Sequence, residues 1–214
     1  MRKFLTNIIL VFPAILFSQQ IDSFIINEIK SQGLKSHSDA IILTMNNNVI
    51  YENHINNEEK PIYIASAGKS LVSLAFGKLL DIKLLDSLDQ PVHTIFPQWN
   101  QGNKKFITVR MLLNHTSGIQ NNLNASVELE PAPNHKVSNI IDLALAAELS
   151  DIPGEKLHYN NKVVALLGGI VEKLSGKRFD YFFVDEFYKP MNIEQYDWVK
   201  DEAGNPTVHG ALIY

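Results

Sequence analysis

A serine and a lysine that could act together occur at Ser66 and Lys69, within the segment Ser-Ala-Gly-Lys. If a helix begins near Ser66, side chains three residues apart lie on one face and within reach of each other. A serine hydroxyl is a weak nucleophile until a base takes its proton, and a neutral lysine can be that base. A chain of this composition is expected to contain such a spacing by chance. On the spacing alone, a helix-capping serine beside a solvated lysine is therefore the simpler interpretation.

A tyrosine and an asparagine form a second candidate pair at Tyr159 and Asn161, directly before a predicted helix. A tyrosine beside a cation can lose its proton more easily and relay protons, while an amide can orient a lysine or a substrate. The same Tyr-x-Asn pattern also occurs at residues 51–53, so the tripeptide alone is a weak signal. A helix cap formed by Asn160 or Asn161 behind a packed aromatic ring is the alternative.

Several other chemistries find no support in the sequence. The chain has no cysteine, which excludes disulfides, thiolate metal sites and a cysteine nucleophile. Its seven histidines form no H-E-x-x-H pattern, so we predict no metal and interpret His115 and His158 as structural. The glycine patterns of nucleotide-binding sites and the G-x-S-x-G of α/β-hydrolases are absent, so no cofactor is predicted. A formal net charge of −4 without a basic block argues against a nucleic-acid partner.

The elements that must position these residues begin with a helix and a hairpin. A short amphipathic helix is predicted over Asp22–Gln32, ended by Gly33, and two β-prone runs at 40–45 and 49–51 flank an Asn-rich turn. Further helices are predicted from near Ser66, from a Thr108 cap to Leu113, and over 137–149, 161–174 and 179–188. Gly176 is expected to end the helix over 161–174, and residues 120–133 are predicted to form a loop. No strand is predicted after residue 190. The fold class is therefore α+β, although a two-stranded hairpin needs further strands to be stable in water.

The first twenty residues have a different character from the rest. Arg2 and Lys3 precede a mostly apolar run over 4–17, and small or polar residues follow at 18–20. This layout is typical of a secretory signal peptide, because the apolar run is short for a membrane span. We expect a secreted or periplasmic protein with no stable membrane span once residues 1–20 are removed. An uncleaved N-terminal anchor is the alternative.

Four segments, taken in order, are more specific than either catalytic pair. They are Tyr63–Ser70, Leu80–Val92, Ile107–Ile119 and Leu157–Asn161. This series resembles the serine β-lactamase and penicillin-binding-protein-like hydrolases, specifically the branch of class C β-lactamases, esterases and D-aminopeptidases. The resemblance covers about residues 22 to 214, and its most specific part is Arg110–Ile119.

The resemblance implies roles for four residues. Ser66 would be the acylated nucleophile, Lys69 its activating partner, Tyr159 the proton relay and Asn161 the orienting amide at the substrate. It also implies an antiparallel sheet flanked by helices, an inserted helical domain, and an active site between the two. The implied reaction is hydrolysis of an amide or ester through an acyl-enzyme, without a metal or organic cofactor. The substrate would be a small molecule or a peptide: a β-lactam, a D-amino-acid peptide or a small ester.

The sequence departs from the family pattern at its C-terminal end. Family members continue beyond the equivalent of 208–211 through further sheet strands, one of which carries a Lys-Thr-Gly or His-x-Gly motif at the substrate. Here no Lys-Thr-Gly occurs, and His209-Gly210-Ala211 lies too early. We therefore expect residues 21–214 to be an incomplete, C-terminally truncated β-lactamase-like domain, with sheet strands missing and hydrolysis impaired. A non-catalytic peptidoglycan-binding or interaction protein on the same scaffold is the alternative.

Overall fold

The computed structural model describes residues 22–55, 62–120, 139–208 and 212–213. The predicted signal peptide and nearly all of the predicted 120–133 loop lie outside these residues. The chain divides into two compact units, residues 1–59 and 60–214. All the candidate catalytic residues belong to the second unit.

The first unit holds the predicted helix and hairpin. Helix α1 (Ser23–Lys35) begins where the Asp22 carboxylate accepts a hydrogen bond from the Phe24 amide at 2.9 Å. Strands β1 (Ala40–Met45) and β2 (Asn48–His54) pair antiparallel. The turn places Asn46 and Asn47 at φ 51° and 62°, in the left-handed region that asparagine tolerates. The hairpin prediction is thus confirmed.

The prediction that Gly33 ends the first helix was wrong, because α1 continues to Lys35. Gly33 is buried, and the side chains of Ile41 and Ile55 occupy the space that a Cβ at this position would need. The glycine therefore permits close packing of the helix on the hairpin instead of ending the helix.

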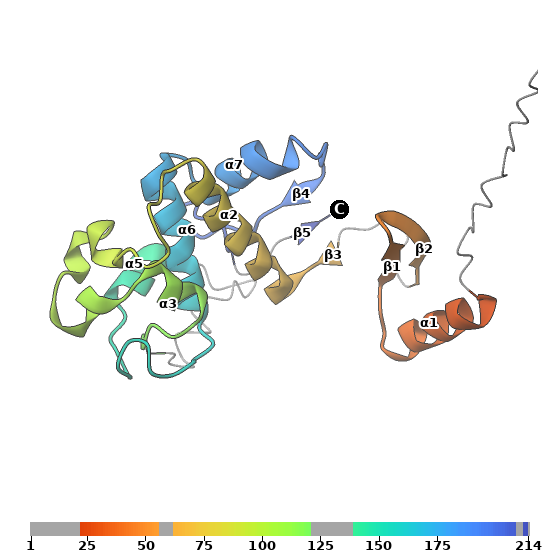
Figure 1. Cartoon of the computed structure of the whole chain (residues 1–214), viewed down its shortest axis with the longest axis horizontal. Helices are drawn as coiled ribbons and strands as arrows, with labels where there is room; N and C mark the ends of the chain where they lie inside the picture. The colour runs from red at the N-terminus through yellow and green to blue at the C-terminus, as the bar shows by residue number, and fades with distance from the viewer. Residues whose placement is uncertain (1–21, 56–61, 121–138, 209–211, 214) are drawn as a thin grey trace, which may run out of the picture. The chain divides into compact units, whose positions relative to one another are not determined.

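The second unit is mainly helical and is built around one central helix. In chain order it contains β3 (Ile62–Tyr63), η1 (Ala65–Gly68), α2 (Lys69–Asp81), η2 (Val92–Thr94), η3 (Pro97–Trp99), η4 (Gly102–Phe106), α3 (Val109–Leu113), α5 (Ile140–Ala146), α6 (Asn161–Ser175), α7 (Phe179–Phe183), η5 (Val184–Tyr188), β4 (Tyr196–Asp197) and β5 (Leu212–Ile213). Helix α6 contacts α2, α3, α5 and α7 (Figure 1). Its residues from Lys162 to Val171 are all buried, so it forms the middle of the hydrophobic core.

The termini of two helices match the sequence predictions. The Thr108 hydroxyl caps α3 by accepting a hydrogen bond from the Met111 amide at 3.2 Å. Gly176 follows α6 at φ 70°, the left-handed conformation that commonly ends a helix.

One other predicted helix is shorter than expected, and another changes its helix type along its length. The described part of the 137–149 prediction is helical only over α5, because Ala147 is extended and Leu149 forms a β-bridge with Ile119. The 179–188 prediction divides into α7 and a π-helical turn, η5.

The prediction of no strand after residue 190 was wrong. Strands β4 and β5 form an antiparallel sheet with β3, in the order β3-β5-β4. Each of these strands has only two residues, too few to show the alternating pattern by which a strand is recognised in a sequence. The fold is thus mixed, with helices and small antiparallel sheets.

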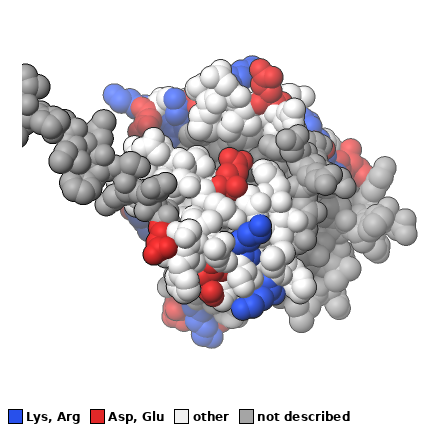
Figure 2. All heavy atoms as spheres, turned by 90° about the vertical axis from the view of Figure 1, so that its right-hand side faces the viewer, with Lys and Arg blue, Asp and Glu red and all other residues white. Residues whose placement is uncertain are grey.

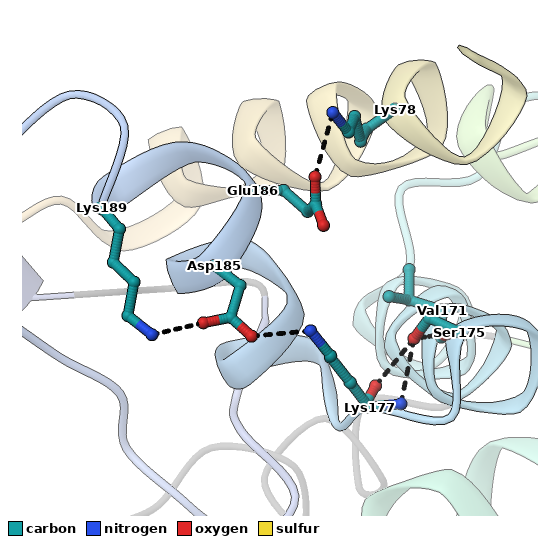
Figure 3. A network of polar contacts seen from close by, with 7 residues as sticks. All are labelled: Lys78, Val171, Ser175, Lys177, Asp185, Glu186 and Lys189. Carbon is teal, nitrogen blue, oxygen red and sulfur yellow. Dashed lines mark hydrogen bonds and ion pairs between the residues drawn. The ribbon is translucent and has the colours of Figure 1, made fainter. Parts of the chain in front are cut away.

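One ion pair connects α2 with the segment that follows α6, and two more lie within that segment (Figure 3). The Lys78 ammonium lies 3.0 Å from the Glu186 carboxylate, which ties α2 to η5. Asp185 accepts hydrogen bonds from Lys177 at 2.7 Å and from Lys189 at 2.6 Å. The pair between Lys78 and Glu186 supplements the packing of α2, which begins at the candidate site, against the region around α6.

Charged side chains of both signs share the face drawn in Figure 2. Acidic and basic groups lie among uncharged residues there, and neither sign covers this face. Within the described ranges, no helix has both the length and the apolar composition that crossing a membrane requires.

Candidate active site

Three of the predicted site residues meet in the second unit. The Lys69 ammonium donates a hydrogen bond to the Ser66 Oγ at 3.0 Å. The Tyr159 hydroxyl donates to the same oxygen at 2.8 Å, across 93 residues of sequence. The Lys69 Nζ also lies 4.9 Å from the centre of the Tyr159 ring. The Ser66 oxygen is thus the point on which a cation and a phenol converge.

The start of α2 sets the positions of Ser66 and Lys69. Ser66 lies in the 3₁₀ turn η1, which leads directly into α2 at Lys69, so the two side chains share one face as predicted. Neither η1 nor α2 has a side-chain cap, and the Ser66 hydroxyl instead receives the hydrogen bonds of Lys69 and Tyr159. The structure therefore contradicts the helix-capping interpretation of Ser66.

Ala65, directly before the serine, has φ 45°. A residue with a Cβ is strained in this left-handed region, and such strain is concentrated at functional sites. The backbone at Ser66 is therefore held by its surroundings and not by local preference.

Tyr159 is held in place through its neighbour Asn160, which is 1% exposed. The Asn160 side chain caps α6 by accepting a hydrogen bond from the Lys162 amide at 2.9 Å, and its Nδ2 donates to the carbonyl of Ile119 at 3.0 Å. The capping interpretation of this tripeptide is thus correct for Asn160. It does not compete with the functional interpretation, because the cap holds the backbone from which Tyr159 extends.

Asn161 is the first residue of α6. Its Oδ1 is buried and has no hydrogen-bond partner among the described residues. A buried amide oxygen without a partner is costly, so it is a group that a ligand or water would satisfy.

Lys69 changes the acid–base behaviour of Tyr159. Partial burial alone would raise the pKa of the Tyr159 phenol. Its hydrogen bonds to Lys69 and Ser66, together with the positive charge of Lys69, outweigh that effect and hold the pKa below its ordinary value. Tyr159 is 49% exposed and Ser66 is also exposed, so a substrate can reach both residues from solvent.

His115 is a residue of this site that the sequence analysis had assigned to a structural role. Its ring stacks on the Tyr159 ring, with centroids 4.9 Å apart and planes 28° apart. Burial and the charge of Lys69 lower the pKa of the His115 imidazole. No local pattern predicts this contact, although His115 lies in the most specific segment of the resemblance. His158, in contrast, directs its side chain to Asp151 at 3.3 Å.

Among the described residues, no group of three or more His, Asp or Glu side chains is arranged to hold a metal ion. The second Tyr-x-Asn lies in β2 of the first unit, where the Tyr51 hydroxyl is buried without a hydrogen-bond partner among the described residues. The two copies of the tripeptide thus have different surroundings.

The fold is that of β-lactamase-like serine hydrolases. The sequence model of the family described as Beta-lactamase matches residues 26–212, and the chain belongs to this family. It is 26% identical over 154 residues to Protein flp of Staphylococcus aureus (strain N315), covering 71% of this chain and 30% of that protein. It is 27% identical over 171 residues to Beta-lactamase-like protein 4 of Dictyostelium discoideum, covering 70% and 28%.

A solved structure has the same fold. The octameric penicillin-binding protein homologue from Pyrococcus abyssi superposes with a TM-score of 0.68 at 23% identity, covering 84% of this chain and 45% of that one. The chain thus spans less than half the length of each of these three proteins.

Proposed function

We propose that this protein is an exported serine hydrolase that forms an acyl-enzyme on Ser66. The observation that carries the proposal is the convergence of Lys69 and Tyr159 on the Ser66 oxygen, at 3.0 and 2.8 Å. These are the distances over which a base can take the proton of a nucleophile. Membership of the Beta-lactamase family, a family of serine hydrolases, supports the same reaction class.

In the first step, the Ser66 oxygen attacks the carbonyl carbon of an amide or ester. Tyr159, in its phenolate form, accepts the hydroxyl proton, and the positive charge of Lys69 stabilises that phenolate. The proton then passes to the leaving amine or alcohol as the carbonyl–heteroatom bond breaks. The product of this step is an ester between Ser66 and the acyl group.

In the second step, water attacks the ester carbonyl and gives its proton to the same relay. The proton returns to the Ser66 oxygen as the ester bond breaks, so the acid is released and the serine is restored. These steps need no metal or organic cofactor. The substrate is a small molecule or a peptide with a reactive carbonyl: a β-lactam, a D-amino-acid peptide or a small ester.

The exported location rests on residues 1–20 alone. We expect cleavage near Ser18–Gln20 on secretion. N-terminal sequencing of the secreted or periplasmic protein tests this, and recovery of Met1 would favour an uncleaved anchor.

A covalent probe tests the proposed reaction. The chain is incubated with a fluorescent fluorophosphonate or a fluorescent penicillin, and labelling is compared among the parent, Ser66→Ala and Ser70→Ala. Ser70 is a matched control, because it lies one helical turn away and its hydroxyl donates to the Ala67 carbonyl at 2.7 Å. We expect labelling of the parent and of Ser70→Ala and none of Ser66→Ala.

The non-catalytic alternative predicts the opposite result. A folded parent that takes up no label but sediments with purified peptidoglycan would contradict the hydrolase proposal and support a binding protein. Equal labelling of Ser66→Ala and the parent would also overturn it, because the reactive residue would then lie elsewhere.

A further inference from the structure

His115 contacts the residues on both sides of Tyr159 and the Tyr159 ring itself. Its ring stacks on the Tyr159 ring with centroids 4.9 Å apart, and its Nδ1 accepts a hydrogen bond from the Asn160 amide at 3.1 Å. Its own carbonyl accepts from the His158 amide at 2.8 Å. One residue thus holds the backbone before and after Tyr159 as well as the aromatic ring itself.

The conformation of His115 is itself unfavourable. It has φ 57°, a left-handed conformation that costs a residue with a Cβ free energy, although histidine adopts it more often than most residues. The segment of His115 is attached to the loop before α6, because the Thr116 carbonyl accepts from the Gly154 amide at 2.7 Å. These surroundings hold the imidazole against the phenol in spite of the strain.

We propose that His115 is a positioning residue for Tyr159: its neutral imidazole, stacked on the phenol and bonded to the Asn160 amide, keeps the Tyr159 hydroxyl on the Ser66 oxygen. The inference rests on the proposed function of Ser66 and Tyr159. In this arrangement Nδ1 is the acceptor, so the neutral ring carries its proton on Nε2. Protonation of His115 would place an N–H against the Asn160 amide and break the hydrogen bond that fixes the loop.

The test compares His115→Ala with His115→Asn in the full chain, with His158→Asn as the matched control. Alanine removes both contacts. Asparagine keeps an acceptor near the position of Nδ1 and tolerates positive φ, but lacks the ring. His158 is a histidine next to Tyr159 whose side chain is directed to Asp151 and not to the phenol.

Two measurements are made on each variant. The first is the rate constant for acylation of Ser66 by the fluorophosphonate. The second is the titration of the Tyr159 phenol, followed by the NMR signal of ¹³Cζ-labelled tyrosine and assigned with Tyr159→Phe. Since small displacements of catalytic groups cost up to about a hundredfold in rate, we expect His115→Ala to acylate roughly tenfold slower or more. We expect the phenol pKa to rise toward its ordinary value as contact with Lys69 and Ser66 is lost.

We expect His115→Asn to recover part of both values and His158→Asn to match the parent. A His115→Ala variant with the parent's acylation rate and phenol titration would overturn the proposal. An asparagine variant no better than alanine would contradict the contribution of the Asn160 hydrogen bond. The titration needs no substrate. If the parent forms no acyl-enzyme, the proposed function fails, while a shifted titration in His115→Ala would still support the positioning.

Discussion

Replacing Lys69 with methionine removes the cation from the Ser66 site while keeping a helix-forming side chain of similar length. The change deletes the 3.0 Å hydrogen bond to the Ser66 oxygen and the charge beside the Tyr159 ring. Without that charge the pKa of the Tyr159 phenol rises, so less phenolate is present to accept the serine proton. Both losses act on the reaction and neither acts on the core.

The expected size of the effect follows from these two contacts. Loss of one donor to an oxygen that develops charge costs on the order of 100- to 1,000-fold in rate, and loss of acid–base assistance costs a similar factor. Because both contacts meet at one oxygen, their effects are not additive, and we expect acylation to slow by roughly 100-fold or more. A hydrogen-bonded cation at a partly exposed position contributes little to folding, so thermal unfolding should change only slightly.

The assay is stopped-flow or quenched labelling with a fluorophosphonate, with unfolding followed by circular dichroism. The control is Lys78→Met, the same substitution on the same helix, where the lysine pairs with Glu186 at 3.0 Å and has no recorded contact with Ser66. We expect Lys78→Met to acylate at the parent's rate. Full-speed acylation by a folded Lys69→Met would refute the reasoning, because Lys69 would then be a solvated surface residue.

Three further predictions concern other parts of the chain. Tyr159→Phe should slow acylation at least roughly tenfold while keeping the ring stack on His115, whereas Tyr51→Phe, in the second copy of the tripeptide, should leave the acylation rate unchanged. Equal acylation rates for the two variants would contradict the role of Tyr159 as proton relay. Gly118→Ala should lower the free energy of unfolding, measured by urea titration, by about 2 kcal/mol or more, because φ is 75° and a Cβ would meet a backbone carbonyl. Gly77→Ala should raise it by about 0.5 kcal/mol, because Gly77 is an exposed position of α2 with open space for a Cβ. The two lysine partners of Asp185 lower its pKa to about 2, so the Asp185 carboxylate stabilises the fold at pH values above its unfolded pKa of 3.8 and loses this effect as the pH falls toward 2. An Asp185→Asn variant should therefore show a flatter dependence of the free energy of unfolding on pH between about 4 and 2, and an unchanged slope would contradict the ion pairs.

Local contacts of this site could be predicted from the sequence. Ser66 and Lys69 are three residues apart at a helix start, and helix geometry alone brings their side chains together. The Thr108 cap, the Gly176 terminus and the Asn-rich turn were also predictable, because each depends on the conformational preferences of one or two residues.

Contacts between distant segments could not be derived in this way. The hydrogen bond from Tyr159 to Ser66 joins residues 93 positions apart, and only the family resemblance predicted their proximity. Gly33 looked like a helix terminator because the need for close approach of Ile41 becomes visible only once the hairpin is folded against the helix. Strands β4 and β5 are defined by their pairing with β3, not by any pattern of their own.

Mapping the labelled residue tests the central claim most directly. The mature-length chain is treated with a fluorophosphonate or a penicillin, digested, and sequenced by tandem mass spectrometry. Ser70 and Ser73, both exposed on α2, serve as internal controls. Their hydroxyls donate hydrogen bonds to the Ala67 and Ser70 carbonyls, whereas the Ser66 hydroxyl accepts hydrogen bonds from a lysine and a tyrosine. We predict a single adduct on Ser66, which should not form when the chain is denatured before labelling. An adduct on another serine, or none on a folded chain, would contradict the account.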